Sequence, residues 1–261
     1  MRFHWFANDV GDLPVSKLNS LASYLEGCGY YSFLQVYEPS FSDAFIKSAA
    51  VVNNTSNIKY MLAMRPSGIT PEYFAMIIAG FSRVAKDRLM INIVHGHLDP
   101  AEGAAGIINY DHIFDSREAV LEHSNQFLSM LYKLPPFLLN KPEMVISGVT
   151  EQTISMVKNF GDYLAFDYKN IEDDLIFDLD SGINKMMRLR LVLKNNQAEC
   201  ENFYHNLRDK GSVLVCTPDS FNNYLDSFQQ SGVTDILFAP HPENTDKKSV
   251  HEMVRQLCNN T

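Results

Sequence analysis

The sequence has only four cysteines among 261 residues and no apolar run long enough to cross a membrane. A membrane span needs about 20 consecutive apolar residues. The first residues, MRFHWFANDVGD, also lack the basic and then apolar pattern of a signal peptide. The cysteines share no CxxC spacing, which disfavours a zinc site and a disulfide framework. We therefore expect a protein of the reducing cytoplasm, without membrane contact. The cysteines are Cys28, Cys200, Cys216 and Cys258.

Several motifs that identify enzyme classes are missing as well. The sequence contains no GxSxG, no phosphate-binding P-loop, no GxGxxG and no strip of alternating basic and aromatic residues. These absences disfavour serine hydrolases, NTPases, dinucleotide-binding dehydrogenases and RNA-binding proteins. The net charge of −9 gives no general attraction to nucleic acid or to anionic lipid. An anionic cofactor would therefore need a local cradle.

What the sequence does contain is a repeated alternation of short apolar runs and amphipathic segments, with no linker or break in composition between them. This alternation is typical of βα units. The apolar runs are Phe3–Phe6, Ser32–Tyr37, Ile58–Met64, Leu89–Val94, Met144–Ile146, Tyr163–Phe166, Met187–Leu193 and Ile236–Phe238. The helical patterns are Ser16–Glu26, Ser42–Val52, Pro71–Ala85, Glu118–Leu134, Glu151–Phe160, Ala198–Lys210, Ser220–Gln230 and Ser249–Cys258.

Eight such units predict a parallel sheet with both faces covered. The length is close to the roughly 250 residues of a (β/α)8 TIM barrel, so we predict a single domain over residues 1–261. An open, doubly wound sheet of similar size is the alternative. Two helix boundaries are also readable: Thr70-Pro71 predicts a capped helix start, and Gly232 predicts a helix end.

A glycine-containing loop follows the fifth apolar run, with the sequence Ile146-Ser147-Gly148-Val149-Thr150-Glu151. Here a strand ends and a helix begins, and the free N–H groups and dipole of a helix start favour a phosphate. The simpler interpretation is an ordinary helix cap by Thr150, and Glu151 would repel an anion. Both interpretations stay open from the loop alone.

The histidines of Asn92-Ile93-Val94-His95-Gly96-His97 suggest a different chemistry. In an extended strand end His95 and His97 point the same way, and with Asp99 or Asp111-His112 they resemble metal ligands. A barrel metallohydrolase would use bound hydroxide as its nucleophile. The ends of the other runs offer few further ligands, so we expect no metal and favour a histidine that donates a hydrogen bond.

Arginines alternate with apolar residues in the seventh run. Arg188 and Arg190 could both face the barrel interior, where an anionic substrate, a flavin or nearby carboxylates would serve as partners. The alternative is that both face outward and pair with acidic helices. Arg65, after the third run, presents the same choice.

Several of these segments together resemble the flavin-dependent monooxygenases of the bacterial-luciferase-like superfamily, and among them the alkanesulfonate monooxygenases most. Residues 58–71, IKYMLAMRPSGITP, are similar to that family's LxFLVAxRPxxxSP, and residues 87–96, DRLMINIVHG, are similar to GRxxxNxVTG. The opening Trp5-Phe6, the Ser147-Gly148 loop and residues 232–235 match as well.

The resemblance implies a barrel that binds reduced FMN supplied by a separate NAD(P)H-dependent flavin reductase, reacts with O2 through a C4a-peroxyflavin, and forms a homodimer through the helices after the second and third strands. Met64, His95 and Gly96 would line the flavin ring. Residues at catalytic positions would be His95, Arg188 and Arg190. The phosphate would be held by Ser147, Gly148, Val149 and Thr150.

The sequence also departs from the family pattern. The substrate side would be formed by Trp5, Arg65, Val10 and Phe41, and the last two stand where the family has a histidine and a cysteine. Val120-Leu121 replaces an Arg-Tyr pair that would bind phosphate. A hairpin before the fifth strand and the mobile lid after the seventh are missing, and lids exclude water from reactive intermediates.

Two main hypotheses follow. The first is a two-component monooxygenase that uses FMNH2 and O2 on an organic substrate larger than a simple sulfonate, for example a natural product or a carrier-bound molecule. The second is a flavin-binding protein or non-catalytic subunit without monooxygenase turnover. A deazaflavin-dependent reductase and the metallohydrolase are further alternatives.

Overall fold

The computed structural model describes residues 1–7, 13–36, 43–95, 116–177, 179, 182–207, 213–241 and 247–259. Its strands are β1 (Arg2–Ala7), β2 (Ser32–Gln35), β3 (Lys59–Met64), β4 (Leu89–Ile93), β5 (Glu143–Ser147), β6 (Tyr163–Asp167), β7 (Asn184–Leu193), β8 (Val213–Cys216) and β9 (Asp235–Ala239). Its helices are α1 (Val15–Gly27), α2 (Ala44–Val51), α3 (Pro71–Ala85), α5 (Arg117–Leu131), α6 (Pro135–Leu138), α7 (Glu151–Phe160), α8 (Asp174–Phe177), α9 (Gln197–Asn206), α10 (Pro218–Gln230) and α11 (Lys247–Asn259). Short 3-10 turns cover Val52–Asn54, Pro66–Gly68 and Tyr168–Asn170.

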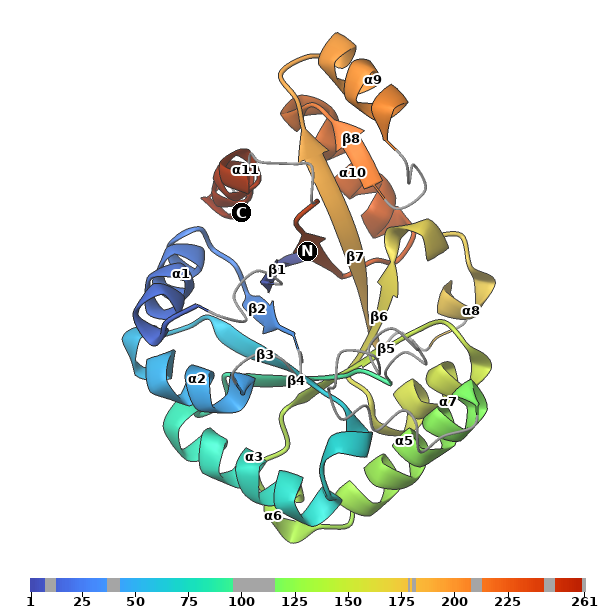
Figure 1. Cartoon of the computed structure of the whole chain (residues 1–261). Helices are drawn as coiled ribbons and strands as arrows, with labels where there is room; N and C mark the ends of the chain where they lie inside the picture. The colour runs from blue at the N-terminus through green and yellow to red at the C-terminus, as the bar shows by residue number, and fades with distance from the viewer. Residues whose placement is uncertain are drawn as a thin grey trace.

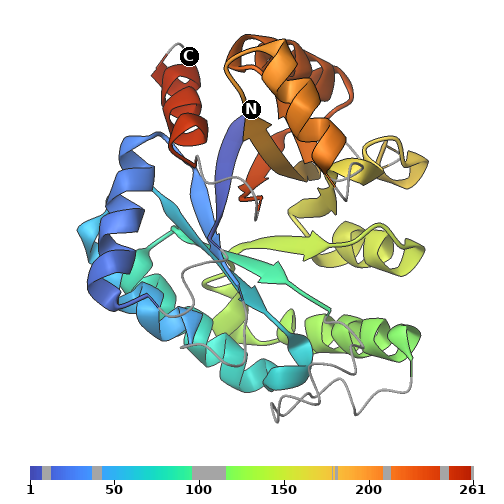
Figure 2. The same ribbon diagram turned by 45° about the horizontal axis from the view of Figure 1, so that its top comes forward.

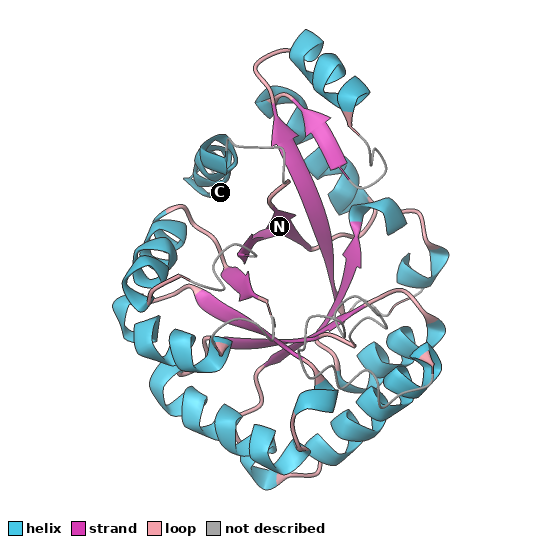
Figure 3. Cartoon of the chain, viewed as in Figure 1, coloured by secondary structure: helices cyan, strands magenta, loops and turns pink. Residues whose placement is uncertain are grey.

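Eight parallel strands close into a ring. The sheet order is β6-β5-β4-β3-β2-β1-β9-β7-β8, and a further pairing of β6 with β7 joins the two sides. Figure 1 shows the strands inside and the helices around them, and Figure 3 shows the same two layers by colour. The predicted (β/α)8 barrel is therefore confirmed, and the alternative of an open sheet is wrong.

One strand outside the ring, β8, was not predicted from the sequence. It pairs with residues Arg190–Leu193 in the outer half of β7, whereas the inner half of β7 pairs with β6 and β9. Together with α9 and α10, β8 forms the projection at the top of Figure 1. The barrel ring is complete without it.

Helix boundaries follow the signals expected from the sequence. The hydroxyl of Thr70 accepts a hydrogen bond from the N–H of Tyr73, and Pro71 occupies the first helical position of α3. Gly232 has a φ of +77° after α10, where a residue with a Cβ would be strained. The C-terminal helix α11 packs beside α1 (Figure 2), and Arg255 on α11 donates to Sγ of Cys28 at the end of α1. Within the described residues no helix is both long and apolar enough to span a membrane.

Alternate residues of each strand face the barrel interior or the helices, as strand geometry requires. On β3, Met61 and Ala63 belong to the interior cluster, while Leu62 and Met64 belong to the large core beneath the helices. The interior cluster consists of Leu34, Met61, Ala63, Met90, Val145, Tyr163, Ala165, Met186 and Leu237.

A buried polar network fills the N-terminal end of the barrel. Nε of Arg2 lies 2.8 Å from Oδ1 of Asp235, and Nε2 of His4 also lies 2.8 Å from that oxygen. Nδ1 of His4 lies 2.7 Å from Oγ of Ser32. Burial alone would raise the pKa of Asp235. Its hydrogen bonds with His4 and Arg2 outweigh that effect, so the pKa of Asp235 is lowered overall. Glu143 extends the network by accepting hydrogen bonds from Tyr31 and Tyr163. This end of a barrel serves stability, and the network closes it.

Candidate active site

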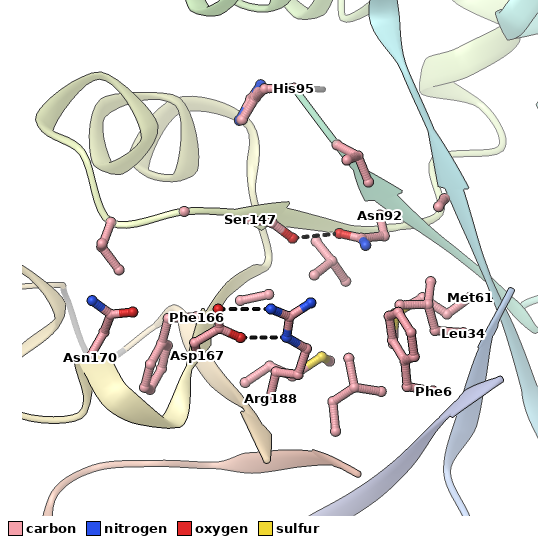
Figure 4. A pocket seen from close by; sticks show the side chains of 18 of the residues that line it. Phe6, Leu34, Met61, Asn92, His95, Ser147, Phe166, Asp167, Asn170 and Arg188 are labelled. Atoms are coloured by element: carbon pink, nitrogen blue, oxygen red, sulfur yellow. Dashed lines mark hydrogen bonds and ion pairs between the residues drawn. The ribbon is translucent and has the colours of Figure 1, made fainter. Parts of the chain in front are cut away.

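A cavity of about 410 Å³ opens at the other end, where the strands carry their carboxyl termini. Phe6, Leu34 and Met61 lie together on one side of it, and Asp167 and Asn170 lie on the opposite side (Figure 4). Such a volume is within the range of small-molecule and cofactor sites. Apolar residues that line it include Phe6, Leu34, Met61, Ala63, Val145 and Leu237. Polar residues that line it include Asn92, His95, Arg117, Ser147, Asp167 and Arg188.

The loop from Ser147 to Thr150 forms part of the rim. Gly148 has a φ of +131°, and a Cβ on it would lie 3.1 Å from Oγ1 of Thr153, so the backbone approaches α7 more closely than other residues allow. Thr150 caps α7 by accepting a hydrogen bond from the N–H of Thr153. The capping interpretation of Thr150 is thus confirmed. It leaves the remaining N–H groups of the first turn of α7 without partners inside the helix.

His95 lies at the end of β4 with a side chain that is 5% exposed. Within the described part of the chain, neither ring nitrogen has a hydrogen-bond partner. Burial, together with the positive charge of Arg117, lowers its pKa to about 4. The imidazole is therefore neutral at pH 7 and offers one donor and one acceptor.

Arg188 faces the cavity and binds a carboxylate of the neighbouring strand. Its Nε and Nη2 donate to the two carboxylate oxygens of Asp167, with Nη2 2.7 Å from Oδ2 (Figure 4). The two residues are direct neighbours in the register of β6 and β7. Of the partners considered from sequence, a nearby aspartate is the one present. Arg190 lies further along β7, opposite Val213 of β8, and is not among the described residues that line the cavity.

Two residues expected at the site lie elsewhere. Met64 packs in the core beneath the helices, and Ala63 has the cavity position. Trp5 is in the same outer core, with its ring 4.4 Å from that of His251. The expected placement of Met64 and Trp5 in the cavity is therefore corrected: each has the outward orientation of its strand. Arg65 follows β3 half-buried and does not belong to the described cavity lining.

Other expected residues, Val10, Phe41 and Gly96, lie outside the described residues. The same holds for His97, Asp99, Asp111 and His112 of the metal hypothesis. Among the residues that are described, no three His, Cys, Asp or Glu side chains form a group that could hold a metal ion.

Sequence reasoning missed several cavity residues. Asn92 stands inside a motif used for the resemblance, yet its side chain received no role. Arg117 begins α5, and Asp167 ends β6. The position of Asp167 at a strand end is the signal that could have identified it, because barrel enzymes place functional groups there. Arg117 gave no comparable signal.

The connection expected to lack a lid is short. β7 ends at Leu193 and α9 begins at Gln197. The described stretch between α5 and β5 contains α6 and no strand, so the hairpin is absent there as well.

No family model matches the sequence. A riboflavin lyase, solved with modified FMN and the substrate riboflavin, is 12% identical, with a TM-score of 0.78 over 100% of this chain and 91% of that chain. The EDTA monooxygenase from Chelativorans sp. BNC1 is 13% identical, with a TM-score of 0.74 over 100% and 93%. The coenzyme F420-dependent tetrahydromethanopterin reductase from Methanopyrus kandleri is 11% identical, with a TM-score of 0.76 over 98% and 97%.

The chain shares its (β/α)8 barrel fold with these enzymes. At identities of 11–13% these likenesses establish the fold. The chemistry of this barrel has to be argued from its own site, because one fold hosts many reactions.

Proposed function

We propose that this protein is a flavin-dependent monooxygenase that uses reduced FMN and O2. The observation that carries the proposal is the shape of the cavity: an apolar interior joined to a rim with a close-approach glycine, Gly148, and the cation Arg117. This arrangement matches a molecule with a flat, largely apolar ring system and an anionic tail. The fold shared with an EDTA monooxygenase supports the same chemistry.

The residues present fit FMN. Its isoalloxazine ring would lie against the interior wall formed by Leu34, Met61 and Val145. Its phosphate would lie at the start of α7, held by Arg117, by the first-turn N–H groups and by the segment Ser147, Gly148, Val149 and Thr150. A helix start attracts an anion through its dipole. The sequence analysis assigned no cation to the phosphate, and Arg117 would supply this positive charge.

Bound reduced FMN would supply the electrons that activate O2. The protein would position it and exclude water by the apolar walls. His95, neutral and without a partner among the described residues, would exchange a proton or a hydrogen bond with the reacting group through a ring nitrogen. This proposal gives the catalytic role to His95, which lines the cavity, and not to Arg190, which is not part of the described lining.

The substrate is proposed to be an organic molecule, with a natural product or a carrier-bound molecule as the form that suits an open site. The connection from β7 to α9 is too short to contribute a long covering segment to the rim. The reduced cofactor would come from a separate NAD(P)H-dependent flavin reductase in the cytoplasm.

A homodimer is also proposed, through α2 and α3. Ile46 on α2 is 73% exposed, and Tyr73 and Met76 on α3 are 59% and 63% exposed. Adjacent exposed apolar side chains are typical of a surface that another protein covers.

The function is tested in two stages. FMN and riboflavin are first titrated against the protein by fluorescence quenching, and FMN is expected to bind at least about tenfold more tightly because only it carries the phosphate. Reduced FMN is then mixed anaerobically with the protein and exposed to O2, and reoxidation slower than in buffer is expected. Binding without any effect on reoxidation would favour the non-catalytic flavin-binding protein. Failure of FMN to bind would refute the proposal.

A further inference from the structure

Arg188 lines the cavity together with apolar side chains, and its charge is already compensated by Asp167. The side-on geometry with Asp167 uses Nε and Nη2 for two parallel hydrogen bonds, which is the strongest arrangement for this pair of side chains. Register fixes it, because the two residues are directly opposed on β6 and β7. The pair is thus part of the wall before any ligand arrives.

An anionic ligand would be at a disadvantage beside this pair. Nε and Nη2 of Arg188 are used by Asp167, so an anion could reach Nη1. There it would lie beside the carboxylate of Asp167, which the fold holds in place and which would repel it. The ligand would also lose translational freedom on binding, a cost that Asp167 does not bear. Arg188 would in the same way repel a cationic ligand.

Apart from Arg117, the other polar side chains in the described wall are uncharged. His95 is buried, is uncharged at pH 7, and has no partner for either ring nitrogen among the described residues. Asn92, Ser147 and Asn170 add amide and hydroxyl groups. A neutral imidazole donates one hydrogen bond and accepts one, which matches a hydroxyl, carbonyl or amide group. The remaining cation of the described lining, Arg117, would bind the phosphate of the proposed cofactor.

We propose that the substrate of this cavity is an uncharged organic molecule with an apolar body and one hydroxyl, carbonyl or amide group that binds His95, and that the Asp167–Arg188 pair excludes anionic substrates. This inference rests on the proposed function, in that the same cavity takes the cofactor. It assigns Asp167 the role of a specificity-determining residue.

Three probes with the same hydrocarbon chain test the proposal: 1-octanol, 1-octanesulfonate and octylammonium. Each is titrated calorimetrically into protein saturated with FMN, and again into the Arg117→Gln variant without FMN. The second series reports the selectivity even if FMN does not bind, so the two proposals fail separately. Octanol is expected to bind at least about tenfold more tightly than either ion.

Variants separate the pair from general charge effects. Asp167→Asn releases Arg188 and is expected to strengthen octanesulfonate binding about tenfold while octanol changes by less than about twofold. His95→Leu is expected to weaken octanol binding about tenfold, since its hydroxyl loses its partner. Glu252→Gln removes the same charge from an exposed pair on α11 and is expected to change nothing.

Tighter binding of either ion than of octanol would overturn the proposal, and so would an Asp167→Asn variant that folds and keeps the wild-type preference. If that variant does not fold, the salt dependence of octanesulfonate binding to Arg117→Gln decides, because this variant keeps Arg188 and lacks the other cation of the described lining. Octanesulfonate binding that weakens steeply with salt would show an arginine available to anions and would overturn the proposal. Binding that is weak and independent of salt supports it.

Discussion

The hydroxyl of Ser147 donates a hydrogen bond of 2.8 Å to Oδ1 of Asn92, and this bond joins the carboxyl ends of β5 and β4 at the cavity wall. Both residues point into the barrel (Figure 4). The bond orients the residue directly before Gly148, and therefore the start of the loop proposed to hold the phosphate.

Replacing Asn92 by leucine, which has a similar volume, removes the acceptor and leaves the Ser147 hydroxyl without this partner. The FMN dissociation constant is expected to rise about five- to tenfold, corresponding to about 1 kcal/mol for one lost hydrogen bond. Fluorescence titration measures it. Asn206→Leu, at an exposed site on α9, is the control and is expected to leave binding unchanged. An Asn92→Leu variant with wild-type affinity would contradict a role for this bond.

Gly148→Ala tests the close approach of the loop to α7. The substitution is expected to cost about 1–3 kcal/mol of unfolding free energy, because a residue with a Cβ is strained at this φ and meets the buried Thr153. FMN binding should weaken as well. Gly80→Ala is the matched control: Gly80 lies within α3 with open space at its Cβ position, so it should gain about 0.5–1 kcal/mol. Urea unfolding of both variants measures the contrast.

The stability of the protein is expected to fall between pH 6.5 and pH 4. Burial lowers the pKa of His95 to about 4, and burial with the charges of Lys247 and Arg255 lowers that of His251 to about 4. Each histidine is neutral in the folded state, whereas the unfolded chain binds a proton below about pH 6.5. Their contributions are thus complete above pH 6.5 and are lost as the pH falls towards 4.

For His95 the loss reaches about 2–3 kcal/mol near pH 4.5. Urea unfolding at pH 7 and pH 4.5 measures the total change, and His95→Gln should reduce it by about that amount, because glutamine does not titrate. An unchanged difference between the two pH values in His95→Gln would show that this histidine does not titrate as the burial implies.

Met76→Glu tests the proposed homodimer. A carboxylate in an apolar interface leaves a charge without water, so the variant is expected to run as a monomer in sedimentation or light scattering while the wild type runs as a dimer. Glu118→Gln, on the first turn of α5, should keep the dimer. A monomeric wild type would refute the proposed assembly.

The fold was predictable from the sequence because the apolar runs and the helix signals of the barrel repeat along the whole chain. Eight of the strands coincide with predicted runs. β8 was missed because four residues, VLVC, resemble the end of a loop as much as a strand. Its partner is the extended outer half of β7, and nothing in the run Met187–Leu193 indicates that half of it leaves the ring.

The orientation of strand residues was harder to predict. A strand covered on both sides is apolar on both sides, so MLAM in β3 does not reveal that Ala63 faces the cavity and Met64 faces the helices. The ion pair was out of reach for a related reason. Asp167 and Arg188 are 21 positions apart, and only the register of β6 and β7 brings them together.

The polar network of Arg2, His4 and Asp235 has a consequence for kinetics. It lies across one end of the barrel, so the proposed cofactor and substrate would share the opening at the other. Whichever of the two sits deeper must arrive first and depart last. We therefore expect compulsory-order kinetics, in which a dead-end analogue of the outer ligand traps the inner one and slows its exchange.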